Sequence, residues 1–245
     1  MTDRVAVVTG AGSGIGLAAA RQLLAERYRV VGIGRDRHRI EEALGDGVLA
    51  LGVDVSNPDA VADGVATIGR TFGRIDALVN CAGIVTRSAL VDMDPGDLHR
   101  VIAINLMGTI HCTQQCIALL TEHSGSIVNL SSTLAVRPVA NIAAYATTKA
   151  GIEGFTRAMA VELAPYRVRV NAVAPAMVAS PIWRSAGLSE ADYNSLVEAR
   201  TQDYPLGRIG EPGEIAAMIS YLLSERAGWM TGSIITMDGG SSVAA

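Results

Sequence analysis

The chain has 245 residues, of which 49% are hydrophobic and 18% are charged, and its formal net charge is −4 with a pI near 5.6. This length and composition can bury a sizeable core, and we expect one α/β domain over residues 1–245. The acidic balance gives no overall positive field, so neither nucleic acid nor an anionic membrane is expected as a partner. Charged residues also interrupt every apolar run before the roughly 18 residues that span a bilayer.

The start of the chain and its metal-binding residue types bear on where the protein acts. Residues 4–9 read as a strand, without the basic and apolar regions of a signal peptide. Cys81, Cys112 and Cys116 have no paired C-x-x-C spacing, and the four histidines have no H-x-H or H-x-x-x-H spacing. We therefore expect a soluble, cytoplasmic protein without a bound metal.

Short apolar runs alternate with longer helical patterns along the chain. Strands are predicted at 4–9, 29–33, 48–53, 75–79, 126–130, 168–173 and 233–237, and helices near 14–27, 37–44, 57–72, 94–121, 141–164, 189–201 and 211–224. Several strands are almost wholly apolar, which is typical of parallel strands covered on both faces. The alternation predicts a Rossmann-type, doubly wound parallel sheet of about seven strands with helices on both faces. Residues 175–210 lack a strand, and we expect them to cover a site as a substrate loop.

The turn between the first strand and the first helix is rich in glycine. The usual fingerprint G-x-G-x-x-G fails there, because its last position would fall on Ile15 or Leu17. The spacing G-x-x-x-G-x-G fits instead. Glycines let the backbone approach a pyrophosphate closely, and the helix N-terminus adds free amides and a positive dipole end. The turn therefore predicts a dinucleotide site built from Gly10, Gly12, Ser13, Gly14, Ile15 and Gly16.

A possible acid–base pair lies on the helix predicted near 141–164. Tyr145 and Lys149 are four residues apart, so they share one helix face. An ammonium about 5 Å from a phenol, at an effective dielectric of about 20, favours the phenolate by roughly 3 kcal/mol. We therefore expect Lys149 to lower the pKa of Tyr145 by about 2 units, towards the range of a general acid–base catalyst. A nearby hydroxyl from Ser132 could hold a carbonyl or alcohol oxygen.

These motifs together resemble one family. The Thr9–Gly16 turn, Asn80-x-Ala82-Gly83, Asn105, Ser132 and Tyr145-x-x-x-Lys149 are similar to the short-chain dehydrogenase/reductase family, in its branch of roughly 250 residues and nearest its 3-oxoacyl reductase-like members. The resemblance continues to Asp238-Gly-Gly and so covers nearly the whole chain. The chain departs from the family pattern at Cys81, Ala176 and Ser180, none of which removes a proton-transfer group.

The resemblance implies roles for individual residues. Tyr145 would exchange a proton with the substrate oxygen, Lys149 would tune it and bind the nicotinamide ribose, and Ser132 would orient the substrate. Asn105 would support a water that relays protons to the lysine. Asp54 would face the adenine, and Asn80 would hold the central strands beside the cofactor. The other implied cofactor contacts are Val55, Ala82, Gly83, Pro175, Val178 and Ser180.

The end of the second strand bears on the choice of cofactor. A carboxylate there would bind the ribose hydroxyls of NAD and repel a 2′-phosphate. The chain has Gly34 at that place and then Arg35, whose guanidinium can pair with a phosphate. We therefore expect NADP(H) to be preferred. NAD(H) stays possible, because Asp36 can neutralise Arg35 and Ser13 replaces the basic residue often found in NADP-binding turns.

The pattern favours an NAD(P)(H)-dependent oxidoreductase that moves a hydride between nicotinamide and a small ketone or secondary alcohol. The alternative is a non-catalytic dinucleotide-binding regulator on the same fold. Residues 175–210 hold no cluster of basic residues, so a ketoacyl thioester, a cyclic or aromatic ketone, and a polyol all stay open as substrates. Met177, Trp183, Leu188 and Tyr193 are candidates for the pocket lining. The apolar surface of the two longest predicted helices and the family resemblance favour a homotetramer or dimer.

Overall fold

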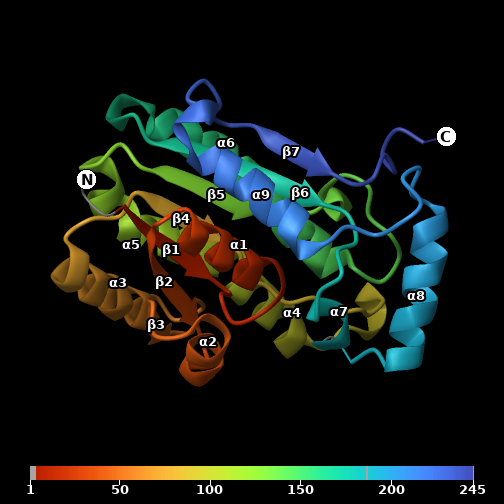
Figure 1. The fold of residues 1–245 in the computed structure, drawn as a ribbon. Helices are drawn as coiled ribbons and strands as arrows, with labels where there is room; N and C mark the ends of the chain where they lie inside the picture. Colours follow the sequence, from red (N-terminus) through yellow and green to blue (C-terminus); the bar gives the residue numbers. More distant parts are fainter. Residues whose placement is uncertain (1–3, 186, 245) are drawn as a thin grey trace.

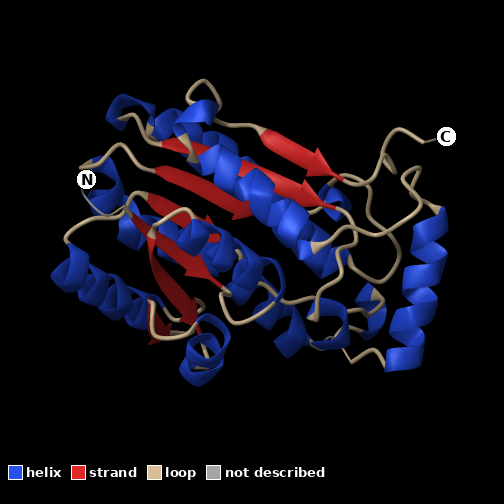
Figure 2. Cartoon of the chain, viewed as in Figure 1, coloured by secondary structure: helices blue, strands red, loops and turns tan. Residues whose placement is uncertain are grey.

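The alternating strands and helices form one parallel sheet with helices on both faces (Figures 1 and 2). The computed structural model describes residues 4–185 and 187–244, so residue 186 of the predicted substrate loop lies outside the described residues. Within them the strands pair in the order β3-β2-β1-β4-β5-β6-β7. Their bounds are β1 Val5–Thr9, β2 Arg29–Gly34, β3 Val48–Gly52, β4 Ala77–Asn80, β5 Ser126–Leu130, β6 Arg169–Pro175 and β7 Ile234–Met237. The structure confirms the predicted doubly wound α/β fold.

The helices begin and end close to the predicted positions. Their bounds are α1 Gly14–Ala25, α2 Arg37–Leu44, α3 Pro58–Phe72, α4 Pro95–Val101, α5 Gly108–Thr121, α6 Ala143–Glu162, α7 Ile182–Ser185, α8 Glu190–Gln202 and α9 Pro212–Leu223. Capping explains some of these starts. The Asn57 side chain accepts hydrogen bonds from the amides of Asp59 and Ala60, with Pro58 as the first helical residue. No helix in the described residues is long and apolar enough to cross a membrane.

Two apolar cores lie on opposite faces of the sheet. On one face, α1, α2 and α9 pack on the strands through residues such as Leu23, Ile40 and Ile219. On the other face, α3, α5 and α6 pack through residues such as Ile68 and Leu120. The inner strands β1, β4, β5 and β6 are buried on both sides, which accounts for their largely apolar character.

The helix expected over residues 94–121 is divided in the structure. A π-helical segment, Ile102–Met107, separates α4 from α5. The wider turn contains Asn105, which is fully buried. Its side chain reaches the backbone of Ile84 outside the helix, and such local widening is frequent at functional sites. Hydrophobic periodicity cannot reveal this change, because every residue of the segment is compatible with an ordinary helix.

The strand order reverses between β1 and β4, and the chain leaves both strands at the same edge of the sheet. Thr9 joins the two exits, because its Oγ1 accepts hydrogen bonds from the amides of Cys81 at 2.9 Å and Ala82 at 3.0 Å. Helices α7 and α8 and the C-terminal tail lie at this edge, where the strand arrows point (Figure 1). Ligands of doubly wound sheets bind at such a reversal point.

Candidate active site

A cavity of about 1040 Å³ opens at the carboxyl ends of the strands. Most of the residues predicted from the sequence line it, namely Gly10, Ser13, Gly14, Ile15, Gly16, Arg35, Ala82, Gly83, Ser132, Tyr145, Lys149, Pro175, Val178 and Ser180. The predicted residues that do not line it, among those described, are Gly12, Gly34, Asp54, Val55, Asn80 and Asn105. The structure thus brings the glycine turn and the Ser–Tyr–Lys group into one space, although they are far apart in sequence.

The glycine turn has the shape that a dinucleotide phosphate requires. A Cβ on Gly16 would lie only 2.3 Å from the carbonyl oxygen of Gly10, so no side chain fits there. Gly14 has a φ of +53°, and a Cβ there would lie only 3.3 Å from the Cβ of Ser180. Ser13, at the N-cap of α1, makes no side-chain cap. The first amides of the helix therefore keep their hydrogen-bonding capacity for an anion, and the turn fits a pyrophosphate.

Asp54 and Val55 lie beside the cavity but are engaged elsewhere. The Asp54 carboxylate accepts hydrogen bonds from the amide and the hydroxyl of Ser56, at 2.9 and 2.6 Å. The bond from the Ser56 hydroxyl is the main reason that the pKa of Asp54 is lowered, and Arg35 adds to the effect. Val55 is buried, and its carbonyl oxygen lies 3.3 Å from Nδ1 of His111.

Ser132, Tyr145 and Lys149 meet where β5 leaves the sheet. Tyr145 and Lys149 lie one turn apart on α6, and all three residues are buried. Ser132 lies near enough to the Tyr145 phenol to lower its pKa. Its Oγ accepts from the Leu134 amide at 3.2 Å and lies 3.4 Å from the Pro175 carbonyl oxygen. Lys149 Nζ donates to the carbonyl oxygen of Leu130 at 2.7 Å and lies 5.5 Å from the centre of the Tyr145 ring. A carbonyl oxygen placed at the phenol would thus meet two hydroxyl donors.

The pKa of the phenol differs from the expectation. Burial raises the pKa of Tyr145 to about 12, and the hydrogen bond from Ser132 lowers it only partly. The predicted lowering of the Tyr145 pKa by Lys149 is therefore wrong. Burial also lowers the pKa of Lys149 to about 8, and its ammonium points to the Leu130 carbonyl. Removal of water therefore outweighs the attraction between the two groups. Tyr145 is a protonated donor at neutral pH in this state.

The amide side chains of Asn105 and Asn80 form hydrogen bonds with segments that border the site. Asn105 accepts from the Ile84 amide at 2.8 Å and donates to the Ile84 carbonyl at 2.9 Å, so its side chain is committed to the loop after β4. Asn80 donates to Asn129 at 2.9 Å and to Thr113 at 3.1 Å, linking β4 to β5 and α5. Both amides are buried, and both fix backbone that borders the cavity.

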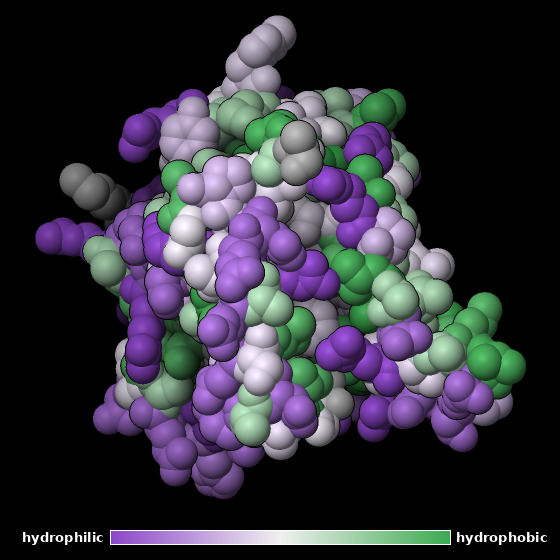
Figure 3. Space-filling model, turned by 90° about the vertical axis from the view of Figure 1, so that its right-hand side faces the viewer, coloured by the Kyte–Doolittle hydropathy of each residue, from purple (hydrophilic) through white to green (hydrophobic). Residues whose placement is uncertain are grey.

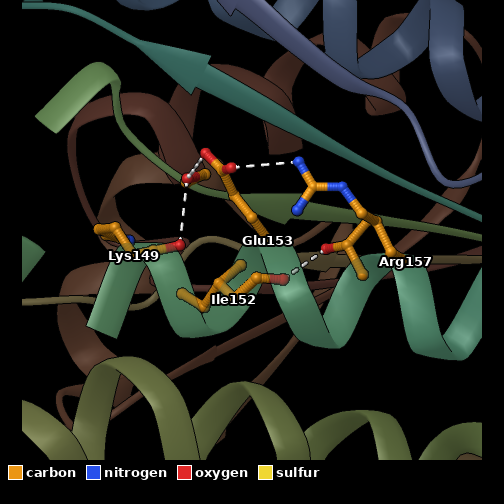
Figure 4. A network of polar contacts seen from close by, with 6 residues as sticks. Lys149, Ile152, Glu153 and Arg157 are labelled. Atoms are coloured by element: carbon orange, nitrogen blue, oxygen red, sulfur yellow. Dashed lines mark hydrogen bonds and ion pairs between the residues drawn. The ribbon is translucent and has the colours of Figure 1, made fainter. Parts of the chain in front are cut away.

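A buried carboxylate next to this group escaped the sequence reasoning. Glu153 lies one turn after Lys149 on α6, and its Oε1 accepts a hydrogen bond from Ser131 Oγ at 3.0 Å. Figure 4 shows the carboxylate between that hydroxyl and the guanidinium of Arg157, whose nearest nitrogen is 3.4 Å away. Spacing of four residues on one helix face was the available signal, since Tyr145, Lys149 and Glu153 repeat it.

The other end of the cavity is an apolar pocket with a polar rim. Val85, Ile142 and Tyr145 form a small cluster, and Trp183 packs against it. Figure 3 looks onto this end of the molecule, where hydrophilic side chains border apolar ones around a recessed middle. Of the four residues named from the sequence as pocket candidates, Met177 and Trp183 line the cavity. Leu188 borders a smaller neighbouring cavity, and Tyr193 packs with Met177 and Tyr204.

No metal centre is assigned to this site. Among residues 4–185 and 187–244, His, Cys, Asp and Glu side chains form no group of three or more that could hold an ion. Cys81 is the cysteine that lines the cavity, and burial raises the pKa of its thiol to about 12.

Comparison with known proteins gives matches over nearly the full length. The family model described as enoyl-(acyl carrier protein) reductase matches residues 10–242. The chain is 38% identical to the short-chain reductase protein NovJ of Streptomyces niveus, covering 97% of this chain and 94% of that protein. It is 40% identical to cis-4-hydroxycyclohexanecarboxylate dehydrogenase of Sinomonas cyclohexanicum, covering 97% and 96%. The solved structure of aldohexose dehydrogenase from Thermoplasma acidophilum superposes with a TM-score of 0.92 at 32% identity, covering 99% of this chain and 95% of that one.

Proposed function

Since the chain belongs to the short-chain dehydrogenase/reductase family and is an NAD(P)-dependent oxidoreductase acting on alcohol or carbonyl groups, we propose that Tyr145 is its proton-transfer residue. The observation that carries the proposal is the placement of the buried Tyr145, Ser132 and Lys149 side chains in the same cavity as the glycine turn. When bound, the nicotinamide dinucleotide supplies or accepts the hydride. Tyr145 gives a proton to the carbonyl oxygen in reduction and takes one from the alcohol in oxidation.

Ser132 and Lys149 support this proton transfer in different ways. Ser132 donates to the substrate oxygen and keeps it within reach of the phenol. Lys149 holds the cofactor ribose and places a positive charge near the ring, which favours the phenolate needed for oxidation. Asn105 acts through Ile84, whose backbone it clamps on both sides, and so keeps the adjoining Gly83 beside the Lys149 ammonium.

The test of this proposal is the variant Tyr145→Phe. Loss of the hydroxyl removes the proton donor, so kcat should fall by roughly 10²- to 10⁴-fold. Dinucleotide binding, measured by the quenching of tryptophan fluorescence, should change little. Tyr166→Phe is the matched control, because Tyr166 is 56% exposed and lies at the far end of α6. A Tyr145→Phe protein with full turnover would reject the assignment and return the non-catalytic dinucleotide-binding regulator to consideration.

We propose NADP(H) as the preferred cofactor. Arg35 and Arg39 both line the cavity, and Arg39 Nε donates to the carbonyl oxygen of Gly12 in the phosphate-binding turn. Asp36, which could have neutralised Arg35, instead accepts from the Arg39 amide as the N-cap of α2. Two guanidinium groups beside the ribose site and no carboxylate at Gly34 support a 2′-phosphate.

The substrate we propose is a small ketone or secondary alcohol. An apolar wall of Val85, Ile142 and Trp183 beside Tyr145 supports a compact hydrocarbon body next to the reacting carbon. The cis-4-hydroxycyclohexanecarboxylate dehydrogenase relative supports a ring-sized substrate. We propose that the segment 175–210, with α7 and α8, acts as the substrate loop over this pocket. A panel of cyclic, aromatic and acyl ketones followed by absorbance at 340 nm tests the class.

Assembly and location are proposals of the same kind. The exposed apolar side chains of Met107, at the end of the π-helical segment, and Val161, on α6, support a homotetramer or dimer. Light scattering of the purified protein tests this. We propose a cytoplasmic location, where reduced nicotinamide cofactors are available, and fractionation of cells that express the chain tests it.

A further inference from the structure

The cavity is strongly basic although the whole chain is acidic. Arg35 and Arg39 lie at the phosphate end, and Lys149 lies in the middle. The arginines that line the remaining part are Arg87, Arg100, Arg137 and Arg200. Asp203 is the carboxylate that lines the cavity among the described residues, while the chain carries a net charge of −4. A low-dielectric cleft of one charge sign concentrates ligands of the opposite sign.

Three of these four arginines already have partners. Their contacts are Arg100 with Asp97 at 2.9 Å, Arg200 with Asp203 at 3.0 Å, and Arg137 with the carbonyl oxygen of Ser241 at 2.6 Å. Arg87 forms no ion pair within residues 4–185 and 187–244. Its guanidinium can therefore bind a ligand without first giving up an internal contact.

The position of Arg87 relates it to the reacting groups. Val85, two residues earlier, is buried against Tyr145 and Ile142. An extended chain advances at most about 3.6 Å per residue, so the Cα of Arg87 lies within roughly 7 Å of that of Val85. The amide of Ser88 donates to the carbonyl oxygen of Asn141 at 2.9 Å, which fixes the backbone just after Arg87. Arg87 thus stands at the rim of the apolar pocket whose floor includes Tyr145.

We propose that the substrate carries a carboxylate, separated from its ketone or alcohol carbon by a compact apolar body, and that Arg87 binds this carboxylate. The inference rests on the proposed function, because it places the carbonyl at Tyr145. The pocket wall holds the apolar body, and the guanidinium pairs with the two carboxylate oxygens in a forked arrangement. Arg87 would then set specificity, since a neutral analogue forms no ion pair with this exposed guanidinium.

A competing partner for Arg87 lies across a second cavity of about 470 Å³, which borders Arg87 and the first turn of α8. Asp192 borders this cavity, but its carboxylate accepts a hydrogen bond from Ser189 Oγ at 2.6 Å, as part of the N-cap of that helix. Asp192 is thus engaged in holding the start of α8. The variant Asp192→Asn shows whether this carboxylate controls Arg87.

The experiment uses the full-length protein saturated with its nicotinamide cofactor. We compare kcat/KM for 4-oxocyclohexanecarboxylate and for neutral 4-methylcyclohexanone, and we measure the binding of cyclohexanecarboxylate by calorimetry. The wild type should prefer the carboxylate. Arg87→Ala should lower that preference and the binding by about 10- to 100-fold, the usual effect of a charge-assisted hydrogen bond, with activity on the neutral ketone retained. Arg87→Lys should keep part of the preference, because it retains the charge and loses the fork.

Arg100→Ala is the matched control, since Arg100 lines the same cavity and is paired with Asp97. It should leave the preference within about twofold, as is usual for an exposed ion pair. Equal losses in Arg87→Ala and Arg100→Ala would overturn the assignment to Arg87. The assignment would also be overturned if the wild type neither preferred the carboxylate substrate nor bound cyclohexanecarboxylate. It would be overturned as well if only Asp192→Asn preferred the carboxylate substrate. If Arg87→Ala lowers kcat/KM for acetoacetyl coenzyme A alone, Arg87 binds a phosphate of that substrate. This result would also overturn the proposed carboxylate site.

These outcomes are separable from failure of the proposed function. If neither ketone is reduced but Arg87 governs cyclohexanecarboxylate binding, the anion site stands and the proposed ring-sized ketone substrate fails. If both ketones are reduced equally by the wild type and by Arg87→Ala, the enzyme stands and the anion site fails.

Discussion

Ser131 Oγ lies 3.0 Å from Glu153 Oε1, and this contact ties the exit of β5 to α6 one turn beyond Lys149 (Figure 4). Both residues are buried, and the Ser131 hydroxyl also lies 3.3 Å from the carbonyl oxygen of Lys149. Because Ser132 follows directly, the pair fixes the backbone on both sides of the proposed reacting groups. We predict that Glu153→Leu lowers the free energy of unfolding by about 1–3 kcal/mol, since it leaves a buried hydroxyl with a weaker partner. Urea denaturation measures this change.

Two further variants separate the hydrogen bond from the charge of Glu153. Glu153→Gln keeps an oxygen that accepts from Ser131 and should retain most of the stability. Arg157→Ala should change it by less than about 1 kcal/mol, because the Arg157 side chain is 58% exposed and its contact is long. If Glu153→Leu unfolds at the same urea concentration as the wild type, the buried contact contributes nothing.

Gly16 and Gly12 offer a matched pair in the phosphate-binding turn. A Cβ on Gly16 would lie 2.3 Å from the Gly10 carbonyl oxygen, whereas one on Gly12 would meet the Arg39 side chain at an ordinary 3.5 Å. We predict that Gly16→Ala destabilises the protein by about 1–3 kcal/mol and weakens dinucleotide binding at least tenfold, because the backbone must shift. Gly12→Ala should change both far less. Thermal unfolding and fluorescence titration measure the two effects, and similar behaviour of the two variants would contradict the clash.

The fold could be predicted from local patterns because most strands are largely apolar and most helices have an apolar face that packs on the sheet. The division of the helix expected over residues 94–121 could not be predicted in this way. The π-helical turn contains Asn105, whose side chain contacts Ile84, 21 residues away in sequence. The phenol pKa was mispredicted for a related reason. The spacing of Tyr145 and Lys149 indicates proximity, but the loss of water that raises the pKa depends on the packing of the whole pocket.

The basic residues around the pocket likewise could not be predicted from local sequence patterns. Residues 175–210 alone hold no basic cluster, and the sequence therefore left the substrate's charge open. The structure places Arg87, Arg100 and Arg137 around the same cavity from three other segments. Such a convergence depends on tertiary structure and leaves no spacing signal in the sequence.

Gly34→Asp tests the choice of cofactor. A carboxylate at the end of β2 would repel a 2′-phosphate and accept from ribose hydroxyls, so the variant should shift the kcat/KM ratio from NADP towards NAD by at least tenfold. The new Cβ would lie 3.3 Å from Cδ1 of the buried Ile40, a tight contact that would affect activity with both cofactors and leave their ratio as the readout. Arg35→Ala should weaken NADP binding and spare NAD. A wild type that favours NAD would refute the assignment.

Lys149 is the chain's single lysine, which makes its ionisation directly measurable. Burial lowers its pKa to about 8, whereas an unfolded lysine titrates near about 10.4. Between these values the unfolded chain binds the extra proton, so the free energy of unfolding rises with pH. We predict that Lys149 alone contributes a rise of about 2 kcal/mol between roughly pH 7 and 9.5, read as the difference between the wild type and Lys149→Met. The subtraction is needed because burial raises the pKa of Cys81, Cys112 and Cys116, which makes stability fall as the pH passes the pKa of an unfolded thiol. Tyr145, with its pKa raised to about 12, stays protonated through this window.

Isotope labelling of lysine gives one side-chain NMR signal, whose shift against pH should follow a midpoint near 8. Urea denaturation of the wild type and of Lys149→Met across the same range should show this rise as a change in the difference between their free energies of unfolding, because methionine has no proton to lose. Lys149→Met should also bind the dinucleotide more weakly, because the ammonium that would hold the ribose is lost. The two measurements thus separate the effect of the buried charge on stability from its role in cofactor binding. A titration midpoint of Lys149 above 10, or the same pH dependence of stability in Lys149→Met as in the wild type, would contradict the prediction. Either result would show that the ammonium is well hydrated and that the site is more open to water than its burial indicates.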